Sequence, residues 1–401
     1  MKGTPSRDRK GAVYPADVAE LSETLGRCGA ERRTVELGGH FTKQTMGGRV
    51  EPADVAISTA GMNRVVEYES RDLTLGVEPG HGFQALTDLL AANHQELPLD
   101  PPLASEATIG GVVAANCCGP RRRLYGSARD LVIGMTFVTL EGKEVRSGGM
   151  VVKNVAGLDI AKLLIGSFGT LAAIARVNFR LYPQPVQEKT FLLAFDSVGP
   201  ALQARDAVLR SALQPQAVDL ANPAAAARLD LGLPARCLLL VEAGGIEAVL
   251  ARYERELKAI AREAGAGEFL PLEEEPARRL WSAVRDFPAL RAEEDSDAAV
   301  LRISTTVSRL GECFAVADAQ PVLARAGSGV AYLRCPSPVA ETLQRARAAG
   351  LYTVVESSTA AEKGNLELWA DPGPELEVMS RIKQALDPHR LLNHGRLYNR
   401  L

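Results

Sequence analysis

Apolar positions in the first hundred residues recur mainly at the short spacing of β-strands. Four runs of this kind, each bounded by glycine or charged residues, are expected to form strands: 33–37, 53–58, 65–68 and 73–77. Helical spacing replaces this pattern at 16–30, where Leu21 and Leu25 share one face, and again at 83–93. Asp17 directly precedes the apolar positions of the first helix and is expected to cap it.

The stretch from Pro98 to Pro185 combines two longer strand-like runs, 131–140 and 171–181, with segments of small residues. The small residues cluster at 108–120, just ahead of the first run. Glycine has no Cβ, so such a segment lets the backbone come close to a flat or polyanionic ligand. A glycine-rich segment laid across β-structure is typical of proteins that hold the phosphates and ring of a large cofactor.

After Pro185 the pattern changes to short strands alternating with amphipathic helices. The expected strands are 191–195, 236–243, 300–307, 330–334 and 352–356, and the expected helices are 201–213, 246–264, 275–287 and 339–348. This alternation predicts an antiparallel sheet covered by helices on one face. The proline-rich sequence LYPQPVQ precedes the change and suits a domain junction.

Length and composition restrict the class of protein. At 401 residues the chain is longer than one usual domain, so two domains are expected. A net charge of −3 gives no electrostatic footprint for a polyanion, which argues against a nucleic-acid partner. The six cysteines show no CxxC or Cys/His spacing, so free thiols in a reducing compartment are expected, with neither a metal site nor an iron–sulfur cluster.

The sequence shows neither a secretory signal nor an apolar run of membrane-spanning length. We therefore expect a cytoplasmic protein with no direct membrane span, whose membrane contact, if any, is made through a partner. Residues 1–12 are expected to form a mobile arm.

Gly38 and Gly39 follow the first predicted strand and open a loop that runs to Gly48. The loop is not the GxGxxG fingerprint of a Rossmann fold, since no such motif opens a helix here. Consecutive N–H groups in such a loop converge on an anion, so these glycines and Thr42 are candidates for binding a diphosphate. A hairpin turn is the alternative, because glycine pairs mark turns in any protein.

Four motifs together resemble one family. They read LPLDPPLASEATIGG, AANCCGPRRRLYGSARD, KNVAGLDIAKLLIGSFGTL and, near the end, LDPHRLLNHGRLY. They are similar to the FAD-binding domain of the vanillyl-alcohol-oxidase (PCMH) superfamily, and most of all to the FAD-binding E subunits of glycolate oxidase (glycolate dehydrogenase) complexes. The resemblance extends from Val13 to Leu401 and is thin between Val186 and Leu386.

The resemblance implies an α+β fold class. A PCMH-type FAD-binding domain of two α/β subdomains is expected at 13–185, and a ferredoxin-like antiparallel-sheet cap or substrate domain at 186–385. The last segment, 386–401, is expected to return to the FAD domain. His394 stands where the family usually has the proline of an Asn-Pro-Gly turn, while Gly395 is retained.

The resemblance also implies a set of FAD-binding residues on these motifs. They are Gly38, Gly39, His40, Thr42, Ser105, Thr108, Ile109, Gly110, Gly111, Asn116, Asp130, Lys153, Gly157, Gly169, Ile174 and Asn393. Hydroxyl and amide groups would bond the phosphates and the flavin edge, and a lysine near the flavin would stabilise negative charge on it. A small-residue turn packed against the first loop is the alternative for the central set, and a solvated surface lysine the alternative for Lys153.

His40 departs from the usual E-subunit sequence, which has glycine at this place. Flavin-linking members of the superfamily read Gly-Gly-His here and bond that histidine to the flavin 8α carbon. Non-covalent FAD is the expected state, and a covalent link at His40 is the alternative.

Three candidates for catalytic roles are Lys153, Arg121 and Arg122. One arginine of the Arg121-Arg122-Arg123 run would clamp a substrate carboxylate through its two-pronged guanidinium. A contact with a partner subunit or a solvated loop is the alternative. Arg285 and Arg302 are weaker candidates of the same kind in the second domain.

Phe168 marks the chain as E-type, because the catalytic D subunits of this family usually have glutamate at that place. The five histidines, His40, His81, His94, His389 and His394, all lie outside 186–385. The second domain therefore lacks both the paired-histidine metal site of related 2-hydroxy acid dehydrogenases and a histidine base for the substrate hydroxyl.

The expected function is that of an FAD-binding subunit of a glycolate oxidase-type complex, an enzyme acting on CH–OH groups. It would oxidise glycolate to glyoxylate by hydride transfer to FAD and pass electrons to partners, a D-type flavoprotein and an iron–sulfur subunit. One alternative is a self-sufficient FAD-dependent oxidase or dehydrogenase of another hydroxy acid or alcohol. Another is a non-catalytic assembly subunit.

Overall fold

The computed structural model describes residues 11–49, 52–150, 159–229, 232, 236–290, 298–358, 363, 366–398 and 401. Its contacts divide the chain into two units. The first consists of Met1–Cys118, Gly126–Gln184 and Asp371–Leu401, and the second of Gly119–Tyr125 and Pro185–Ala370. Of the expected arm at 1–12, only residues 11 and 12 are described.

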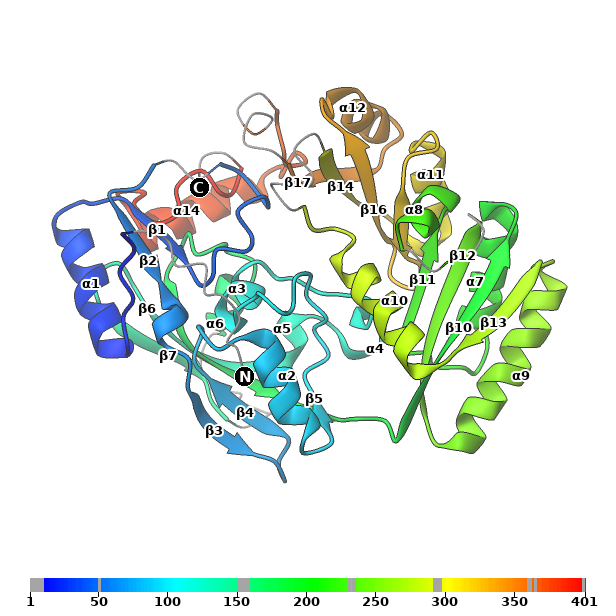
Figure 1. Ribbon diagram of the computed structural model, residues 1–401. Helices are drawn as coiled ribbons and strands as arrows, with labels where there is room; N and C mark the ends of the chain where they lie inside the picture. The colour runs from blue at the N-terminus through cyan, green and yellow to red at the C-terminus, as the bar shows by residue number, and fades with distance from the viewer. Residues whose placement is uncertain are drawn as a thin grey trace. The chain divides into compact units, whose positions relative to one another are not determined.

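The first unit contains small sheets and short helices (Figure 1). Its helices are α1 (Val18–Ala30), α2 (Phe83–Ala91), α3 (Ile109–Ala114), α5 (Ala128–Leu131), α6 (Ala161–Leu164) and α14 (Glu375–Leu386), with a 3-10 turn at Thr59–Gly61. Its strands are β1 (Val35–Gly38), β2 (Val55–Ser58), β3 (Val65–Glu69), β4 (Thr74–Val77), β5 (Gln95–Glu96), β6 (Val132–Val138), β7 (Glu144–Gly148), β8 (Ala173–Arg180) and β9 (Tyr182–Pro183).

Two separate sheets form the core of this unit. β1 and β2 pair in parallel, and α1 covers them by burying Leu21 and Leu25 against Val35 and Ile57. The expected cap of α1 is confirmed, since a carboxylate oxygen of Asp17 accepts the Glu20 N–H at 3.0 Å. The second sheet is antiparallel with strand order β3-β4-β8-β6-β7, and α2 and α3 contribute to the core on it.

The chain's last segment returns to the first unit beside β1. The N–H of Val35 donates to the Leu391 carbonyl at 2.7 Å, and the N–H of Asn393 donates to the Val35 carbonyl at 2.9 Å. The side chain of Lys383 is buried and donates to Asp387 Oδ2 at 2.7 Å. These contacts make the end of the chain part of the first core.

One local prediction for the first unit needs correction, and one helix was not predicted. The strand expected at 131–140 begins at Val132, because Ala128–Leu131 forms one helical turn opened by a Ser127–Asp130 capping box. The small residues at 109–114 form helix α3, with Thr108 as its N-cap. Short helices of Gly, Val and Ala carry little periodic signal, which is why the pattern did not predict α3.

The second unit contains one eight-stranded antiparallel sheet. Its strands are β10 (Gln187–Phe195), β11 (Ala217–Ala221), β12 (Cys237–Gly245), β13 (Glu268–Leu272), β14 (Ala298–Ser304), β15 (Val322–Arg325), β16 (Val330–Pro336) and β17 (Tyr352–Ser357). Its helices are α4 (Arg122–Tyr125), α7 (Val198–Arg210), α8 (Pro223–Arg228), α9 (Glu247–Glu263), α10 (Glu274–Asp286), α11 (Leu310–Ala315) and α12 (Ala340–Ala348), with a 3-10 turn at Val307–Arg309.

The ferredoxin-like pattern occurs twice in this sheet. The elements β10-α7-β11-β12-α9-β13 form one βαββαβ unit with strand order β13-β10-β12-β11. The elements β14-α11-β15-β16-α12-β17 repeat this arrangement with order β17-β14-β16-β15. The two repeats, green and then olive to orange in Figure 1, join where β11 pairs with β15 through Leu220 and Ala324.

The expectation of helices on one face only is wrong. α7, α9, α11 and α12 pack on one face of the sheet, as expected. The opposite face is covered by α8 and α10, which bury Ala225, Leu280 and Trp281 against residues such as Leu240 and Tyr332. Both faces of the central strands are therefore buried, and β11 (AVDLA) is buried at every position. This explains why alternation did not reveal β11.

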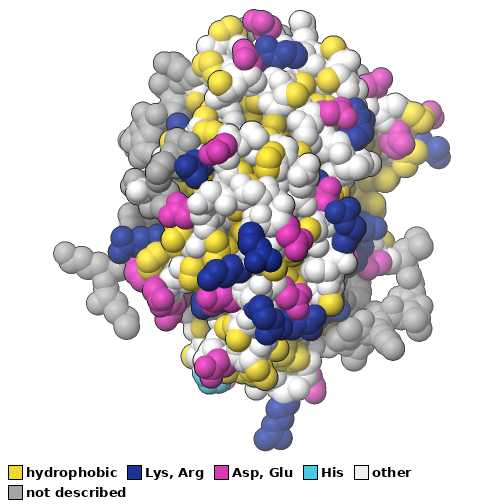
Figure 2. Space-filling view, turned by 90° about the vertical axis from the view of Figure 1, so that its right-hand side faces the viewer, with side chains coloured by type: hydrophobic (Ala, Val, Ile, Leu, Met, Phe, Trp, Pro, Cys, Tyr) yellow, Lys and Arg dark blue, Asp and Glu magenta, His cyan; other side chains and the backbone are white. Residues whose placement is uncertain are grey.

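Charged side chains of both signs are interspersed on the face of the molecule drawn in Figure 2. Ion pairs also occur along helices of the second unit, for example Arg252 with Glu256 at 2.6 Å and Arg278 with Glu274 at 2.7 Å. In the described part of the chain, no helix is long and apolar enough to cross a membrane.

Candidate cofactor site

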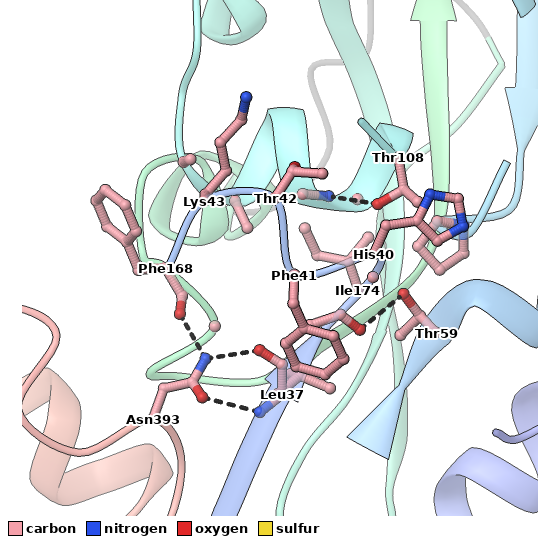
Figure 3. Close-up of a pocket in the computed structure, with 18 of the residues that line it drawn as sticks. Leu37, His40, Phe41, Thr42, Lys43, Thr59, Thr108, Phe168, Ile174 and Asn393 are labelled. Carbon is pink, nitrogen blue, oxygen red and sulfur yellow. Dashed lines mark hydrogen bonds between the residues drawn. The ribbon is translucent and has the colours of Figure 1, made fainter. Parts of the chain in front are cut away.

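Four segments of the first unit line one cavity (Figure 3). They are β1 with the loop after it (Glu36–Gln44), helix α3 with its two caps (Thr108, Gly110, Gly111, Ala114 and Ala115), the region before and within β8 (Ser167, Phe168, Gly169, Ala172 and Ile174), and Asn393 with Arg396 from the last segment. Thr59 and Pro79 complete the lining. All four motifs singled out in the sequence, together with the glycine loop at Gly38–Gly39, therefore contribute residues to one cavity.

The loop after β1 is held by hydroxyl groups from the end of β2. Ser58 Oγ donates to the Gly39 carbonyl at 2.9 Å. Thr59 Oγ1 donates to the Gly38 carbonyl at 3.4 Å (Figure 3). A Cβ added at Gly39 would collide with the Thr108 side chain, so the loop and the start of α3 are in direct contact. Phe41 has φ +52°, an uncommon value for a residue that is not glycine.

Two further residues with positive φ lie on the cavity wall, Phe168 at +52° and Asn393 at +41°. Gly169 has φ +70°, and a Cβ there would lie 2.8 Å from Asn393 Nδ2. Strained backbone of this kind clusters at ligand-binding sites, where the surrounding structure holds it in place.

The cavity also contains buried charge. Glu36, Lys43 and Arg396 line it, and each is less than a tenth exposed. Lys43 Nζ donates to the Pro102 carbonyl at 2.5 Å, and Gln44 Nε2 donates to Glu36 Oε1 at 3.0 Å. Burial lowers the pKa of Arg396 to about 10, although nearby Glu36 partly opposes this.

His40 lies on the cavity wall with one ring nitrogen fixed. Its Nδ1 is 2.9 Å from the Glu106 carbonyl oxygen, which can only accept a hydrogen bond, so Nδ1 carries the hydrogen. In the neutral ring this leaves the lone pair on Nε2.

These features fit a large anionic cofactor such as FAD. Small residues leave space along the wall, Phe168 and Ile174 supply apolar surface, and buried cations exceed buried anions by one. Ligand sites are mostly apolar with a few placed polar groups.

Ten of the sixteen residues predicted to bind FAD line this cavity. They are Gly38, Gly39, His40, Thr42, Thr108, Gly110, Gly111, Gly169, Ile174 and Asn393.

Four of the other six have different surroundings. Ser105 and Asn116 are exposed, and Ile109, the first residue of α3, is fully buried in the core. Asp130 accepts hydrogen bonds from the N–H and hydroxyl of Ser127 at 2.7 and 2.9 Å, so it caps a helical turn. Lys153 and Gly157 lie outside the described residues.

The arginine candidates for a substrate carboxylate belong to the second unit. Arg121 makes a two-pronged contact with Glu242 at 2.9 and 3.0 Å and reaches Glu188 at 2.7 Å. Arg122 is exposed. Arg302 is paired with Glu356 at 3.0 Å, and the pKa of Arg302 is raised mainly by that carboxylate.

Sequence reasoning did not single out several cavity residues: Glu36, Lys43, Gln44, Thr59, Pro79, Ser167 and Arg396. Arg396 directly follows Gly395 in the terminal motif, and this position was the feature of the sequence that could have identified it as a cavity residue. In the described part of the chain, no group of three or more His, Cys, Asp and Glu residues could hold a metal ion.

The sequence also matches two known protein families. A family described as an FAD binding domain matches residues 10–148. A family described as the C-terminal domain of FAD linked oxidases matches residues 184–328 and 368–397.

Among curated relatives, the glycolate oxidase subunit GlcD of Bacillus subtilis is 26% identical over 417 residues, covering 96% of this chain and 88% of that protein. A mitochondrial cytochrome-type D-lactate dehydrogenase of Arabidopsis thaliana is 26% identical over 413 residues, covering 96% of this chain and 72% of its own. The glycolate oxidase subunit GlcE of Escherichia coli is 38% identical over 122 residues, which are 30% of this chain and 35% of that protein.

A solved structure of p-cresol methylhydroxylase with bound substrate shares the fold, with a TM-score of 0.73 at 16% identity, covering 96% of this chain and 88% of that one. The α+β PCMH-like fold with a large antiparallel sheet in the C-terminal domain is thereby confirmed.

Proposed function

Because the chain belongs to the FAD-linked oxidases with a PCMH-type FAD-binding domain, we propose that it is the FAD-binding subunit of a glycolate oxidase- or glycolate dehydrogenase-type complex. Its substrate is a small 2-hydroxy acid. The observation that carries the proposal is the meeting of the Gly38–Gln44 loop, α3, the Phe168 region and the last segment around one cavity.

Within that cavity we assign FAD binding to the loop backbone, Thr42, Thr108, Gly110, Gly111 and Asn393. When bound, FAD supplies a ring that accepts a hydride from the carbon bearing the substrate hydroxyl. Phe168 and Ile174 exclude water from one wall, and the strained turns keep the loop amides in fixed positions. Lys153 remains a proposed source of positive charge near the cofactor.

We propose non-covalent FAD, with a covalent bond to His40 as the alternative. The hydrogen bond from His40 Nδ1 to Glu106 would leave Nε2 as the nucleophile for such a bond. Acid precipitation of the purified protein separates the two cases. Yellow flavin released to the supernatant supports non-covalent binding, whereas colour that stays in the pellet and disappears in His40→Ala supports the covalent link.

Two features favour an E-type subunit that works with partners. Phe168 occupies the place where D subunits usually have glutamate, and the second unit contains no histidine in its sequence. The chain therefore offers no histidine in that unit to take the proton of a substrate hydroxyl. We propose a D-type flavoprotein and an iron–sulfur subunit as partners, and the cytoplasm as the location.

The alternative is a self-sufficient dehydrogenase of another hydroxy acid. It is favoured by the similarity to D-lactate dehydrogenase, which extends over 96% of the chain.

The test is anaerobic reduction of the flavin absorbance by glycolate, D-lactate and D-2-hydroxyglutarate. Each acid is added to the chain alone and to the chain co-purified with its partners. Reduction by glycolate only in the complex supports the proposal, and full-rate reduction of the isolated chain supports the alternative. A protein that binds its partners but never any flavin would point to an assembly role and overturn both.

A further inference from the structure

Arg396 joins the end of the chain to the loop after β1. Its Nη2 donates to the Lys43 carbonyl at 2.8 Å, and its Nη1 donates to Gln44 Oε1 at 3.4 Å. The guanidinium also lies over the Phe168 ring, 5.3 Å from the ring centre. Only 7% of the residue is exposed, and it lines the cavity.

The third nitrogen of this guanidinium, Nε, makes no hydrogen bond in the described part of the chain. The Nε atom is also buried. Buried N–H groups are almost always paired, so an unpaired one on a cavity wall marks a place where a ligand supplies the acceptor.

The charge of the cavity agrees with this conclusion. Arg396 and Lys43 face a single buried carboxylate among the lining residues, that of Glu36. Lys43 Nζ donates to the Pro102 carbonyl, and Glu36 accepts a hydrogen bond from Gln44 Nε2. Among the buried lining residues the positive charges exceed the negative charges by one, and a bound anion would balance that excess.

We propose that Arg396 binds the diphosphate of FAD, with its Nε–H as a direct donor to a phosphate oxygen. This inference rests on the proposed FAD site and names the residue that neutralises the cofactor's charge. A diphosphate is favoured over the flavin ring because the oxidised ring is uncharged, whereas the guanidinium is positively charged at neutral pH. The contacts of Arg396 with Lys43 and Gln44 also place it on the loop whose backbone is suited to phosphate.

A consequence is that cofactor binding and docking of the chain's end stabilise each other. Arg396 belongs to the segment held by the buried Lys383–Asp387 pair and by Asn393. A diphosphate bound to Arg396 would therefore favour the docked segment, and the docked segment would favour the diphosphate.

The test measures binding of three probes to the flavin-free full-length chain: FAD, ADP, which has the diphosphate without flavin, and riboflavin, which has the flavin without phosphate. Arg396→Gln removes the charge but keeps an amide donor for the Lys43 carbonyl. Arg396→Lys keeps the charge. Arg205→Gln is the matched control, because Arg205 is 2% exposed and lies in the second unit.

We expect Arg396→Gln to weaken the binding of FAD and of ADP by a similar factor, roughly 10- to 100-fold, and to leave the affinity for riboflavin unchanged. Arg396→Lys should recover part of the loss, and Arg205→Gln should change none of the three. The salt dependence of ADP binding should become shallower in Arg396→Gln, because one ionic contact is gone.

If both Arg396 variants lost affinity for riboflavin and for ADP to the same extent, the residue would only shape the loop. A loss confined to the two flavin compounds would place the cation at the ring. Unchanged binding of all three would remove any ligand role. Each of these results overturns the inference while leaving the FAD site standing. Failure of the wild-type chain to bind FAD and ADP would instead overturn the proposed function as well.

Discussion

The side-chain amide of Asn393 hydrogen-bonds both backbone groups of Leu37, which lies 356 positions earlier in the chain. Oδ1 accepts the Leu37 N–H at 2.8 Å, and Nδ2 donates to the Leu37 carbonyl at 3.0 Å (Figure 3). Nδ2 also donates to the Phe168 carbonyl at 2.7 Å. One side chain thereby ties the loop after β1 and the Phe168 turn to the last segment.

We expect Asn393→Ala to lower the free energy of unfolding by about 2–3 kcal/mol, because three backbone groups lose their partner. Asn393→Asp should lower the free energy of unfolding further near neutral pH, because a carboxylate keeps the contact to the Leu37 N–H but repels the carbonyl oxygens of Leu37 and Phe168. Urea unfolding measures both effects. Asn93→Ala, which removes an exposed amide at the end of α2, should change the value by less than about 0.5 kcal/mol. Equal effects at both positions would contradict the bridging role.

The contact between Gly39 and Thr108 predicts a strong interaction between two motifs. Gly39→Ala should destabilise the protein by about 1–3 kcal/mol and weaken FAD binding, because the new Cβ overlaps the Thr108 side chain. Thr108→Ala removes the nearest atom but also the cap of α3, so it carries its own cost.

A double-mutant cycle separates the cost of the steric overlap from the cost of losing the α3 cap. The combined variant should be more stable than the sum of the single losses predicts, by about 1 kcal/mol or more. Gly199→Ala is the control, since nothing lies within 4 Å of a Cβ there. Strict additivity of Gly39→Ala and Thr108→Ala would mean that the loop moves away from α3 without cost.

Much of the fold follows from the sequence because most strands and long helices carry a clear period. The strands β2 to β4 and helices α1, α9 and α10 lie within a few residues of their predicted bounds. The strands β11 and β15 did not emerge, since all their positions are buried and no alternation marks them. β13 contains Pro271, which argues against a strand in a sequence but is tolerated at a sheet edge.

The site was predictable where it depends on short motifs and not where it depends on tertiary contacts. Gly38, Gly39 and Thr108 stand out by residue type and position. Lys43 and Arg396 do not, because a charged residue in a sequence is usually on the surface. Arg121 shows the same limit in another way, since its run of three arginines suggested ligand binding, whereas its ion-pair partners Glu188 and Glu242 are far away in sequence and could not be foreseen.

The buried pair of Lys383 and Asp387 predicts a large stability effect at the end of α14. Lys383 is 2% exposed, and burial lowers the pKa of its amine. Lys383→Met should lower the free energy of unfolding by about 3–5 kcal/mol, because Asp387 would keep a buried, uncompensated charge. Lys143→Met, at an exposed ion pair, should cost less than about 0.5 kcal/mol. A small effect of Lys383→Met in thermal or urea unfolding would mean that Asp387 becomes protonated or solvated instead.

The burial of the Cys313 thiol leads us to expect that the protein loses stability at alkaline pH. The thiol is fully buried, and burial raises its pKa to about 11 from an ordinary value of 9.0. The folded state therefore keeps a proton that the unfolded state releases, so stability is complete below pH 9 and falls as the pH rises toward 11. The loss should reach about 2–3 kcal/mol.

Urea unfolding between pH 7 and pH 11 measures this slope. Cys313→Ala should show a constant loss from the cavity it leaves, together with a shallower alkaline slope than wild type. Cys28 and Cys237, whose pKa values are also raised by burial, should account for part of the remaining slope. Parallel curves for wild type and Cys313→Ala would contradict the assignment.

Arg121 allows a structural role to be separated from a substrate role. Its guanidinium is 15% exposed and is held by Glu242, which is 7% exposed. Arg121→Met should lower the free energy of unfolding by about 2–3 kcal/mol, because Glu242 would lose its counter-charge. Adding Glu242→Gln should recover most of that loss, while Arg122→Met, at an exposed position, should change little.

Kinetics of the complex complete this test. If the pair is structural, the double variant Arg121→Met/Glu242→Gln should regain the KM for the 2-hydroxy acid along with its stability. If Arg121 binds the substrate carboxylate, KM should stay at least tenfold raised in both variants, because neither retains a cation at that place. The bidentate contact with Glu242 favours the first result, since a guanidinium already neutralised by two carboxylates has little attraction left for a third.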